Sequence, residues 1–253
     1  MKIVEATWEV RNLGRRAFEI SLDKRDCQDV DKVLSGLMDP QYNGAYVTVK
    51  LPAGNLACLH ALEDFGFRFL ENQLEVRYAL SKYKTPPQIQ NLIVPVSIKE
   101  IPHVLAEWKV IADKITPDLF ETDRISLDPF WGPETGCRRY RNWLLDMCER
   151  DDAHLLVFGD PDDPAVDYGF TLDRLDEGNG VLHGILGGVF CDCDKPGIGF
   201  SIYDASFRND VLRGARVLVS AISSNNPAVI AVDAVLGIAE GIRRSTYVLR
   251  RQF

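Results

Sequence analysis

The chain has 253 residues, 46% of them hydrophobic and 26% charged, and a formal net charge of −8. These proportions allow a sizeable core and exclude fibrous and disordered chains. The acidic excess repels phosphate backbones and so disfavours a nucleic-acid partner. The longest apolar runs are too short to cross a bilayer, and the charged start of the chain lacks the apolar stretch of a signal peptide. We therefore expect a soluble, cytoplasmic protein without a membrane partner.

In chain order, the first block contains two segments of alternating polarity, residues 45–51 and 74–78, which predict strands. Residues 55–65 between them have helical spacing. Residues 81–88 include a double proline, which disfavours both a helix and a central strand. We place a boundary there, which predicts a smaller N-terminal domain over residues 1–85 and a larger C-terminal domain over residues 92–253.

The second block alternates between strand-like and helical patterns. Apolar spacing predicts a strand at 93–96, helices at 98–115 and 133–149, strands at 154–158, 168–175 and 181–190, a helix at 200–213, a strand at 217–222, a helix at 227–236 and a strand at 246–249. Gly214 is well placed to end the helix that precedes it. This order predicts a mixed sheet of the α/β or α+β class, without the strict alternation of a dinucleotide-binding fold.

An internal repeat is visible when the two blocks are compared. Asn55 is followed eleven residues later by Gly66, and Asn226 eleven residues later by Gly237. Each asparagine follows a predicted strand, and each glycine precedes another. Asparagine at helix starts and glycine at helix ends is ordinary capping, but the matching strands on both sides favour a duplication.

The cysteines are too irregularly spaced for a disulfide framework, and we expect most of them to be reduced. The close pair Cys191 and Cys193 alternates with Asp192 and Asp194, as in a metal-binding loop. No histidine lies nearby in the sequence, so a short acidic loop is the preferred interpretation and we expect no metal. The six residues are Cys27, Cys58, Cys137, Cys148, Cys191 and Cys193.

The second block resembles the GCN5-related N-acetyltransferase (GNAT) superfamily, and its dTDP-fucosamine acetyltransferase group in particular. The resemblance rests on a strand that ends at Val189, the Gly197-Ile198-Gly199 loop before a helix, and Asn226 followed by Gly237. Residues 123–129 and 140–143 also look like segments of the fucosamine group. The resemblance implies a tandem GNAT-like acyltransferase fold, with a truncated N-terminal copy and a C-terminal copy that holds the acyl-donor cleft.

The resemblance also assigns donor-binding roles. The loop of Gly197, Ile198 and Gly199 would hold the pyrophosphate of acyl-CoA, because glycines and a helix N-terminus favour the close approach of an anion. A main-chain N–H at Val189 or Phe190 would meet the acyl carbonyl. Asn226 would lie at the start of the next helix on the same site.

Three positions depart from the superfamily pattern. Asp194 stands where arginine or glutamine is usual, which would repel a phosphate by roughly 1–4 kcal/mol at about 4 Å. Lys195 replaces a frequent glycine and would offset part of that repulsion. Asp233 stands where many members carry a tyrosine that protonates the leaving thiolate. Asp233 is therefore a candidate catalytic acid if burial keeps it protonated, an amine anchor if it is ionised, or an ordinary exposed helix residue.

Other candidates have a functional and a structural interpretation. His183, in the strand that would line the cleft, is a candidate base for the acceptor amine or a histidine satisfied at a sheet edge. Arg124, Tyr140 and Trp143 would shape the acceptor pocket or belong to the core. Cys191 and Cys193 would allow a covalent acyl intermediate, but no histidine neighbour is evident.

The sequence thus predicts an acyltransferase that moves an acyl group from acetyl-CoA or another acyl-CoA to a small amine, such as an amino sugar or amino acid. We expect no metal, and the sequence leaves open whether the chain forms a homodimer. Two alternatives stay open: a transferase that uses a carrier-protein or aminoacyl-tRNA donor, and a non-catalytic ligand-binding or scaffold protein with the same fold.

Overall fold

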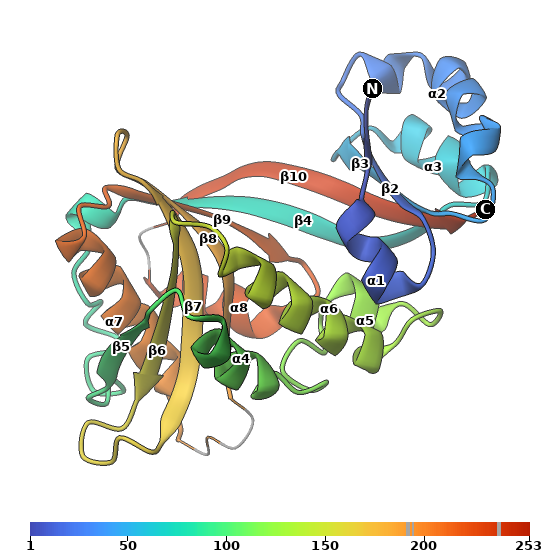
Figure 1. Ribbon diagram of the computed structural model, residues 1–253. Coiled ribbons are helices and arrows are strands. Elements are labelled where there is room, and N and C mark those ends of the chain that lie inside the picture. The colour runs from blue at the N-terminus through green and yellow to red at the C-terminus, as the bar shows by residue number, and fades with distance from the viewer. Residues whose placement is uncertain (191–192, 194, 237–238) are drawn as a thin grey trace.

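A single mixed sheet runs through the molecule in the computed structural model, which describes residues 1–190, 193, 195–236 and 239–253. Its strand order is β1-β2-β3-β10-β4-β9-β8-β7-β6-β5. Two lobes are joined by the long strands β4 and β10 (Figure 1). The strands are β1 (Lys2–Glu5), β2 (Ala17–Ser21), β3 (Tyr46–Pro52), β4 (Arg68–Tyr78), β5 (Ser97–Ile101), β6 (Ala153–Gly159), β7 (Asp167–Asp176), β8 (Val181–Val189), β9 (Val217–Ser223) and β10 (Ala239–Gln252).

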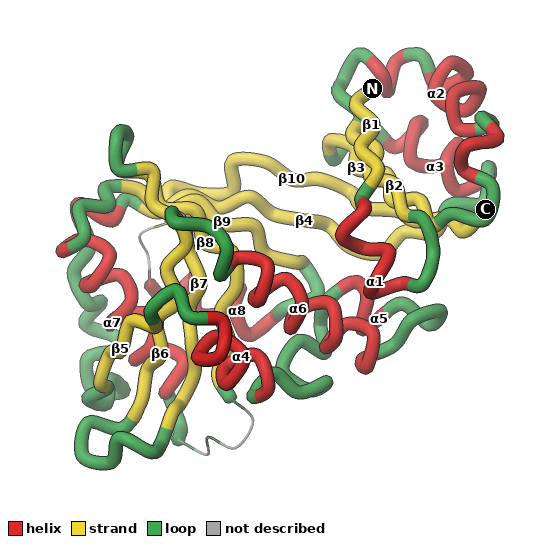
Figure 2. Tube along the Cα trace, viewed as in Figure 1, coloured by secondary structure: helices red, strands yellow, loops and turns green. Residues whose placement is uncertain are grey.

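Helices cover the sheet in both lobes (Figure 2). They are α1 (Val10–Leu13), α2 (Val30–Leu37), α3 (Leu56–Asp64), α4 (Leu105–Asp113), α5 (Arg124–Leu127), α6 (Pro133–Met147), α7 (Ile198–Leu212) and α8 (Pro227–Leu236). In the C-terminal lobe, side chains of α4 and α6 pack with β6 and β7 in one core, and those of α7 and α8 pack with β4 and β9 in another. None of the described helices is long and apolar enough to span a membrane.

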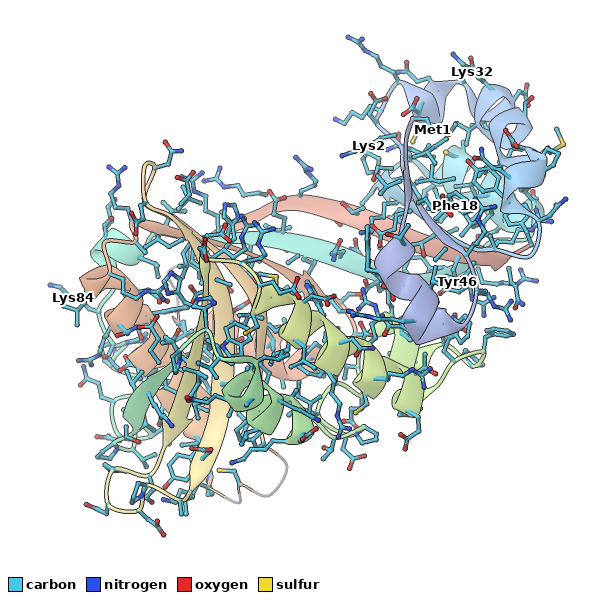
Figure 3. All side chains as sticks on the ribbon, in the orientation of Figure 1. Met1, Lys2, Phe18, Lys32, Tyr46 and Lys84 are labelled. Carbon is cyan, nitrogen blue, oxygen red and sulfur yellow. The ribbon has the colours of Figure 1, made fainter. Side chains whose placement is uncertain are left out.

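Both chain ends lie in the N-terminal lobe (Figure 1). Its core places the α2 and α3 side chains against β2, β3 and the end of β10. The last residue, Phe253, donates its N–H to the Ala45 carbonyl at 3.0 Å and packs against Phe65 and Phe67. Figure 3 shows Phe18 and Tyr46 within this lobe, and Lys84 at the opposite end of the molecule.

The strand order is symmetric about the β10–β4 pair. β2 and β3 are parallel and flanked by antiparallel β1, and β8 and β9 are parallel and flanked by antiparallel β7. The final strand of each half crosses over, so that β10 pairs with β3 while β4 pairs with β9. The unit β1-β2-α2-β3-α3-β4 therefore repeats as β7-β8-α7-β9-α8-β10, which extends the duplication predicted around Asn55 and Asn226.

The connection between the halves follows the outside of α7. Residues 83–96 form neither helix nor strand, which was predicted for residues 83–88 of this segment. Tyr83 and Thr85 donate their hydroxyls to buried Asp204 of α7, each at 2.6 Å, and the Val94 N–H donates to Ser201 at 3.0 Å. The division at residues 86–91 stays a prediction, since one sheet continues across both parts.

Most predicted elements are confirmed, but the predicted position of the first strand of the second block is wrong. The strand is Ser97–Ile101 rather than 93–96, and the following helix begins at Leu105 rather than 98. Proline at 102 cannot continue the strand ladder, and the preceding residues pair with β6 at the sheet edge. β1, β2 and α2 were not predicted from the sequence.

Candidate functional site

The main opening in the sheet lies between β8 and β9. These parallel strands pair only from Val181 with Val217 to His183 with Val219, and beyond this point the described residues show no pairing between them. β8 continues to Val189 along β7 alone. The two strands therefore part at the carboxyl end of β8, which leaves one edge of that strand available.

Main-chain groups of β8 face this opening. The Phe190 N–H donates to the Tyr168 carbonyl of β7 at 2.9 Å, so Phe190 is bound within the ladder. In an antiparallel pair the amides alternate between facing the partner strand and facing away. Val189, next to Phe190 and paired with Gly169, therefore directs its N–H away from β7. By the same alternation the N–H of Gly187, which pairs with Thr171, also points away from β7. Of the two predicted oxyanion donors, Val189 faces the opening and Phe190 does not.

The glycine loop lies at the start of α7, beside the end of β8. Gly197 caps the helix with φ of 80°, and a Cβ there would come within 3.1 Å of the Leu92 carbonyl oxygen. Ile198 is buried. Gly199 is open, since a Cβ would meet only Val189, at 4.0 Å. The structure thus brings Val189, Gly197, Ile198 and Gly199 together, with the positive end of the α7 dipole.

Lys195 is held by contacts with Asp160 and Tyr168. Its ammonium pairs with Asp160 at 2.9 Å and donates to the Tyr168 hydroxyl, which in turn donates to Asp160. These contacts with Tyr168 and Asp160 raise the pKa of Lys195. Its charge is therefore already partly neutralised. Asp194, the other departure in this loop, lies outside the described residues.

Asn226 directly precedes α8, the second helix beside the opening. Its side-chain oxygen accepts the Val229 N–H at 3.1 Å, and its carbonyl accepts the Ile230 N–H at 3.2 Å. The observed side-chain role is thus a helix cap. Gly237, which was matched to Gly66, lies outside the described residues.

Asp233 is buried rather than exposed, and it faces the core between α7 and α8. It has 7% of its surface accessible, and Oδ1 accepts the hydroxyl hydrogen of Tyr78 from β4. Oδ2 is buried and has no partner among the described residues. Burial raises the pKa of Asp233, and the Tyr78 hydrogen bond opposes that rise. The interpretation as an exposed helix residue is therefore wrong.

His183 lies on the other face of the sheet from Asp233. It is exposed and sits between Arg174 of β7 and Val219 of β9. The neighbouring Leu182 faces the core that contains Tyr78, so His183 must face away from it. The two predicted catalytic residues are thus separated by the sheet.

Apolar residues cover the opening on the His183 face. Ile185 and Leu186 of β8 pack against the α4–α6 core together with Leu119 and Tyr140. A Cβ at Gly188 would lie 3.2 Å from Leu119, so the loop before α5 sits directly on the strand. Tyr140 stacks on Phe120 with centroids 4.0 Å apart and donates to Asp123 at 2.7 Å.

The other acceptor-pocket candidates lie nearer the N-terminal lobe. Arg124 is half-buried and pairs with Glu19 of β2 at 3.5 Å and with Glu71 of β4 at 3.6 Å. Trp143 remains 36% exposed on α6, with the Arg139 guanidinium over its ring. Arg124 therefore joins the lobes through ion pairs.

No cluster of metal ligands occurs within the described part of the chain. Cys191 and Asp192 are outside it, so the acidic loop is not described as a whole. Cys193 is a free, half-buried thiol packed near the start of α7. The remaining four cysteines are free and buried.

Sequence reasoning missed Tyr78 and Gly187. Tyr78 meets Asp233 across 155 positions in the sequence, and only the exchange of final strands brings them together. Gly187 had a local signal, because Gly184, Gly187 and Gly188 make β8 unusually poor in side chains for a strand.

Comparisons with known proteins identify the fold. The sequence matches no protein-family model and no curated protein. Among solved structures, the chain is similar to a GCN5-related N-acetyltransferase from Sphaerobacter thermophilus, with a TM-score of 0.58 and 11% identity, covering 99% of this chain and 75% of that one. The chain is also similar to a GCN5-related N-acetyltransferase from Kribbella flavida, with a TM-score of 0.53 and 13% identity. That match covers 94% of this chain and 82% of the other.

A tandem GNAT protein from the clavulanic acid biosynthesis pathway is also similar, with a TM-score of 0.50 and 14% identity, covering 81% of this chain and 64% of that one. The chain therefore has the GNAT fold, as predicted. These matches do not separate the fucosamine group from other GNAT proteins.

Proposed function

We propose that this protein is an acyltransferase that moves an acyl group from acyl-CoA to the amine of a small molecule. The observation that carries the proposal is the parting of β8 and β9 after His183, with the Val189 amide directed into the opening and the glycine loop beside it. The fold shared with GNAT proteins supports the same activity class.

The donor would lie along the free edge of β8. An extended chain with amide groups, such as the pantetheine arm, satisfies a free strand edge as an added strand would. Its pyrophosphate would meet the N-terminus of α7, where Gly199 has no side chain and the helix dipole favours an anion. Lys195 would contribute less than the sequence suggested, because Asp160 already pairs with it at 2.9 Å.

The transfer is a direct displacement at the thioester. The neutral amine attacks the carbonyl carbon, the oxygen gains negative charge, and a main-chain N–H of β8 nearer its parting from β9 would stabilise it. Val189 contacts the position of Gly199, so its N–H would serve the pyrophosphate end of the pantetheine arm and not the acyl carbonyl predicted from the resemblance. The C–S bond then breaks, the nitrogen loses a proton and the sulfur gains one. Holding both substrates in one opening supplies much of the acceleration. His183, on the exposed face, is the proposed acceptor of the amine proton.

The acceptor class rests on resemblance alone. An amino sugar or amino acid would approach from the face that carries His183, where Leu119 and Tyr140 pack near β8. The alternatives are a carrier-protein or aminoacyl-tRNA donor, and a ligand-binding protein without catalysis. Acetyl-pantetheine separates the donor alternatives, because it keeps the thioester and lacks the nucleotide.

Calorimetric titration with acetyl-CoA tests the proposal. We expect one binding event for the parent chain and at least roughly tenfold weaker binding for Gly199→Asp, because a carboxylate would meet the pyrophosphate at the helix end. Gly178→Asp is the matched control, since it adds the same charge at an exposed turn in the connection between β7 and β8. A folded parent chain that binds neither acetyl-CoA nor acetyl-pantetheine would overturn the proposal.

A further inference from the structure

A cavity of about 510 Å³ lies between α7 and the segment that connects the two halves of the chain. Its volume falls within the range of small-molecule sites, about 300–1,000 Å³. We call it the linker cavity, and it is lined by Tyr83, Lys84, Thr85, Gln90, Ile93 and Arg208. Arg208 lies ten residues beyond Ile198, or roughly 15 Å along the helix, so this cavity is separate from the glycine loop.

Buried groups hold both walls of the linker cavity. Asp204 of α7 is 3% exposed and accepts the hydroxyl hydrogens of Tyr83 and Thr85, each at 2.6 Å. The Tyr83 ring meets Phe207 edge-on, with the ring centroids 5.2 Å apart. Ile89, between the lining residues in sequence, is fully buried in the same core. The shape of the cavity is therefore built into the fold.

Arg208 is fixed in place and keeps unused donors. Its Nε pairs with Asp204 at 2.8 Å, and one Nη donates to the Thr85 hydroxyl. A guanidinium carries five N–H donors, and the described residues give Arg208 no other partner. The side chain is still 62% exposed. Its remaining N–H groups can therefore bind both oxygens of a carboxylate in the fork geometry that arginine favours.

The linker cavity is a positively charged site on an acidic chain. Lys84 is exposed at the outer edge of the molecule (Figure 3) and forms no ion pair with the described residues. Lys84 and Arg208 thus stand against the single carboxylate of Asp204, and none of the described lining residues is acidic. The net charge of the whole chain is −8, so this local excess of one positive charge favours a monovalent anion.

Apolar surface distinguishes an organic anion from an inorganic one. Ile93 and the Tyr83 ring are half-buried and pack against the core beneath α7. An inorganic anion would use the two cations and leave this apolar wall in contact with water. A carboxylate attached to an apolar body would cover the wall, and removal of that surface from water favours binding.

We propose that the linker cavity binds a small organic carboxylate, with Arg208 as its two-point anchor, Lys84 as a second cation, and Tyr83 and Ile93 against its apolar body. The site does not depend on the proposed function, because none of its lining residues belongs to the opening between β8 and β9 or to the glycine loop.

Titration of the full chain with benzoate, followed through the amide signals in NMR spectra, tests the proposal. Benzoate joins a carboxylate to a flat apolar ring, and benzamide is a neutral ligand of the same shape. We expect benzoate to shift the signals of residues 83–93 and of the last turns of α7, with a Kd of about 10 mM or tighter. Benzamide should bind at least roughly tenfold more weakly.

Arg208→Lys separates two-point binding from charge, because lysine keeps the cation and loses the fork. We expect benzoate to bind at least about fivefold more weakly to this variant. Arg150→Lys is the matched control, since it changes another exposed arginine that pairs with an aspartate. Lys84→Gln should weaken binding by about twofold or more, whereas Lys109→Gln, which removes an exposed charge on α4, should leave it unchanged.

Four results would overturn the proposal or part of it. No signal change at the cavity with benzoate would overturn the site. Equal affinity for benzoate and benzamide would overturn the carboxylate assignment, and inorganic phosphate that binds there as tightly as benzoate would overturn the organic one. Equal affinity of the parent and Arg208→Lys would remove Arg208 as the anchor. Acetyl-CoA binding by the same chain is measured separately, so none of these results bears on the proposed function.

Discussion

Arg250, near the end of the chain, forms a bidentate ion pair with Asp128, the residue that follows α5. Both nitrogen–oxygen distances are 2.7 Å, and Asp128 is 1% exposed. Tyr46 of β3 adds a hydrogen bond to the same carboxylate at 3.3 Å. The pair connects β10, which closes the N-terminal lobe, to the loop that precedes α6. It therefore fixes the position of one lobe against the other.

Removal of Arg250 should destabilise the protein strongly. Arg250→Ala leaves the Asp128 charge buried without its cation, and we expect a loss of about 3–5 kcal/mol in the free energy of unfolding. Arg150→Ala is the control, because its pair with Asp152 is exposed and should contribute less than about 1 kcal/mol. Urea denaturation of both variants checks the difference. Similar losses would contradict a structural role for the buried pair.

Coenzyme A should bind once per chain. In the N-terminal copy, β2 pairs with β3 along its whole length, from Ala17 with Tyr46 to Ser21 with Lys50. Between these two strands the described residues leave no free edge, whereas β8 parts from β9 after His183. Calorimetric stoichiometry measures this directly. Two equivalent sites would refute the assignment of a single cleft to the C-terminal half.

Elements with clear local signals could be predicted from the sequence. Gly214 ends its helix with φ of 92°, and Asn226 caps α8 through its own side chain. Hydrophobic periodicity likewise located α6 and the strands β6 to β9. β5 was misplaced because it is an edge strand whose first four residues are exposed, so it lacks the apolar alternation of a half-buried strand.

The sheet order and the hydrogen bond between Tyr78 and Asp233 could not be predicted in this way. The exchange of β4 and β10 depends on contacts between residues far apart, such as Leu74 with Ile222. Asp233 appeared as an isolated charge on a helix, because its partner Tyr78 lies in the other half. Local patterns determine which segments form elements, whereas the partner of a buried polar group depends on topology.

The two glycines at the start of α7 should respond in opposite ways to alanine. Gly197 has φ of 80°, and a Cβ there would lie 3.1 Å from the Leu92 carbonyl oxygen. Gly197→Ala should therefore lower the free energy of unfolding by at least about 1–2 kcal/mol. Gly199 is helical and has room for a Cβ, so Gly199→Ala should raise the free energy of unfolding by roughly 0.5–1 kcal/mol. Thermal denaturation compares them. A loss for both would place Gly199 in a strained position.

A second buried acid makes stability depend on pH. Asp210 of α7 is 1% exposed, and burial together with the nearby Asp173 raises its pKa to about 7. Arg213 forms ion pairs with both carboxylates, at 3.2 Å from Asp210 and 3.1 Å from Asp173. One cation is thus shared by two acids, and protonation of Asp210 relieves their repulsion.

The sign of the effect follows from proton binding. Between about pH 4 and pH 7 the folded chain holds a proton on Asp210 that the unfolded chain has released, so stability falls as pH rises, by up to about 1.4 kcal/mol per pH unit from this group. Above pH 7 Asp210 is ionised in both the folded and the unfolded chain, so its contribution to the loss of stability is complete. Asp210→Asn stays neutral, so it should match the parent at pH 4 and exceed its stability at pH 8. Asp151→Asn removes an exposed charge and should leave the pH slope unchanged. Denaturation at the two pH values decides: a parent and Asp210→Asn with equal slopes would mean that Asp210 is ionised in the folded protein throughout this range.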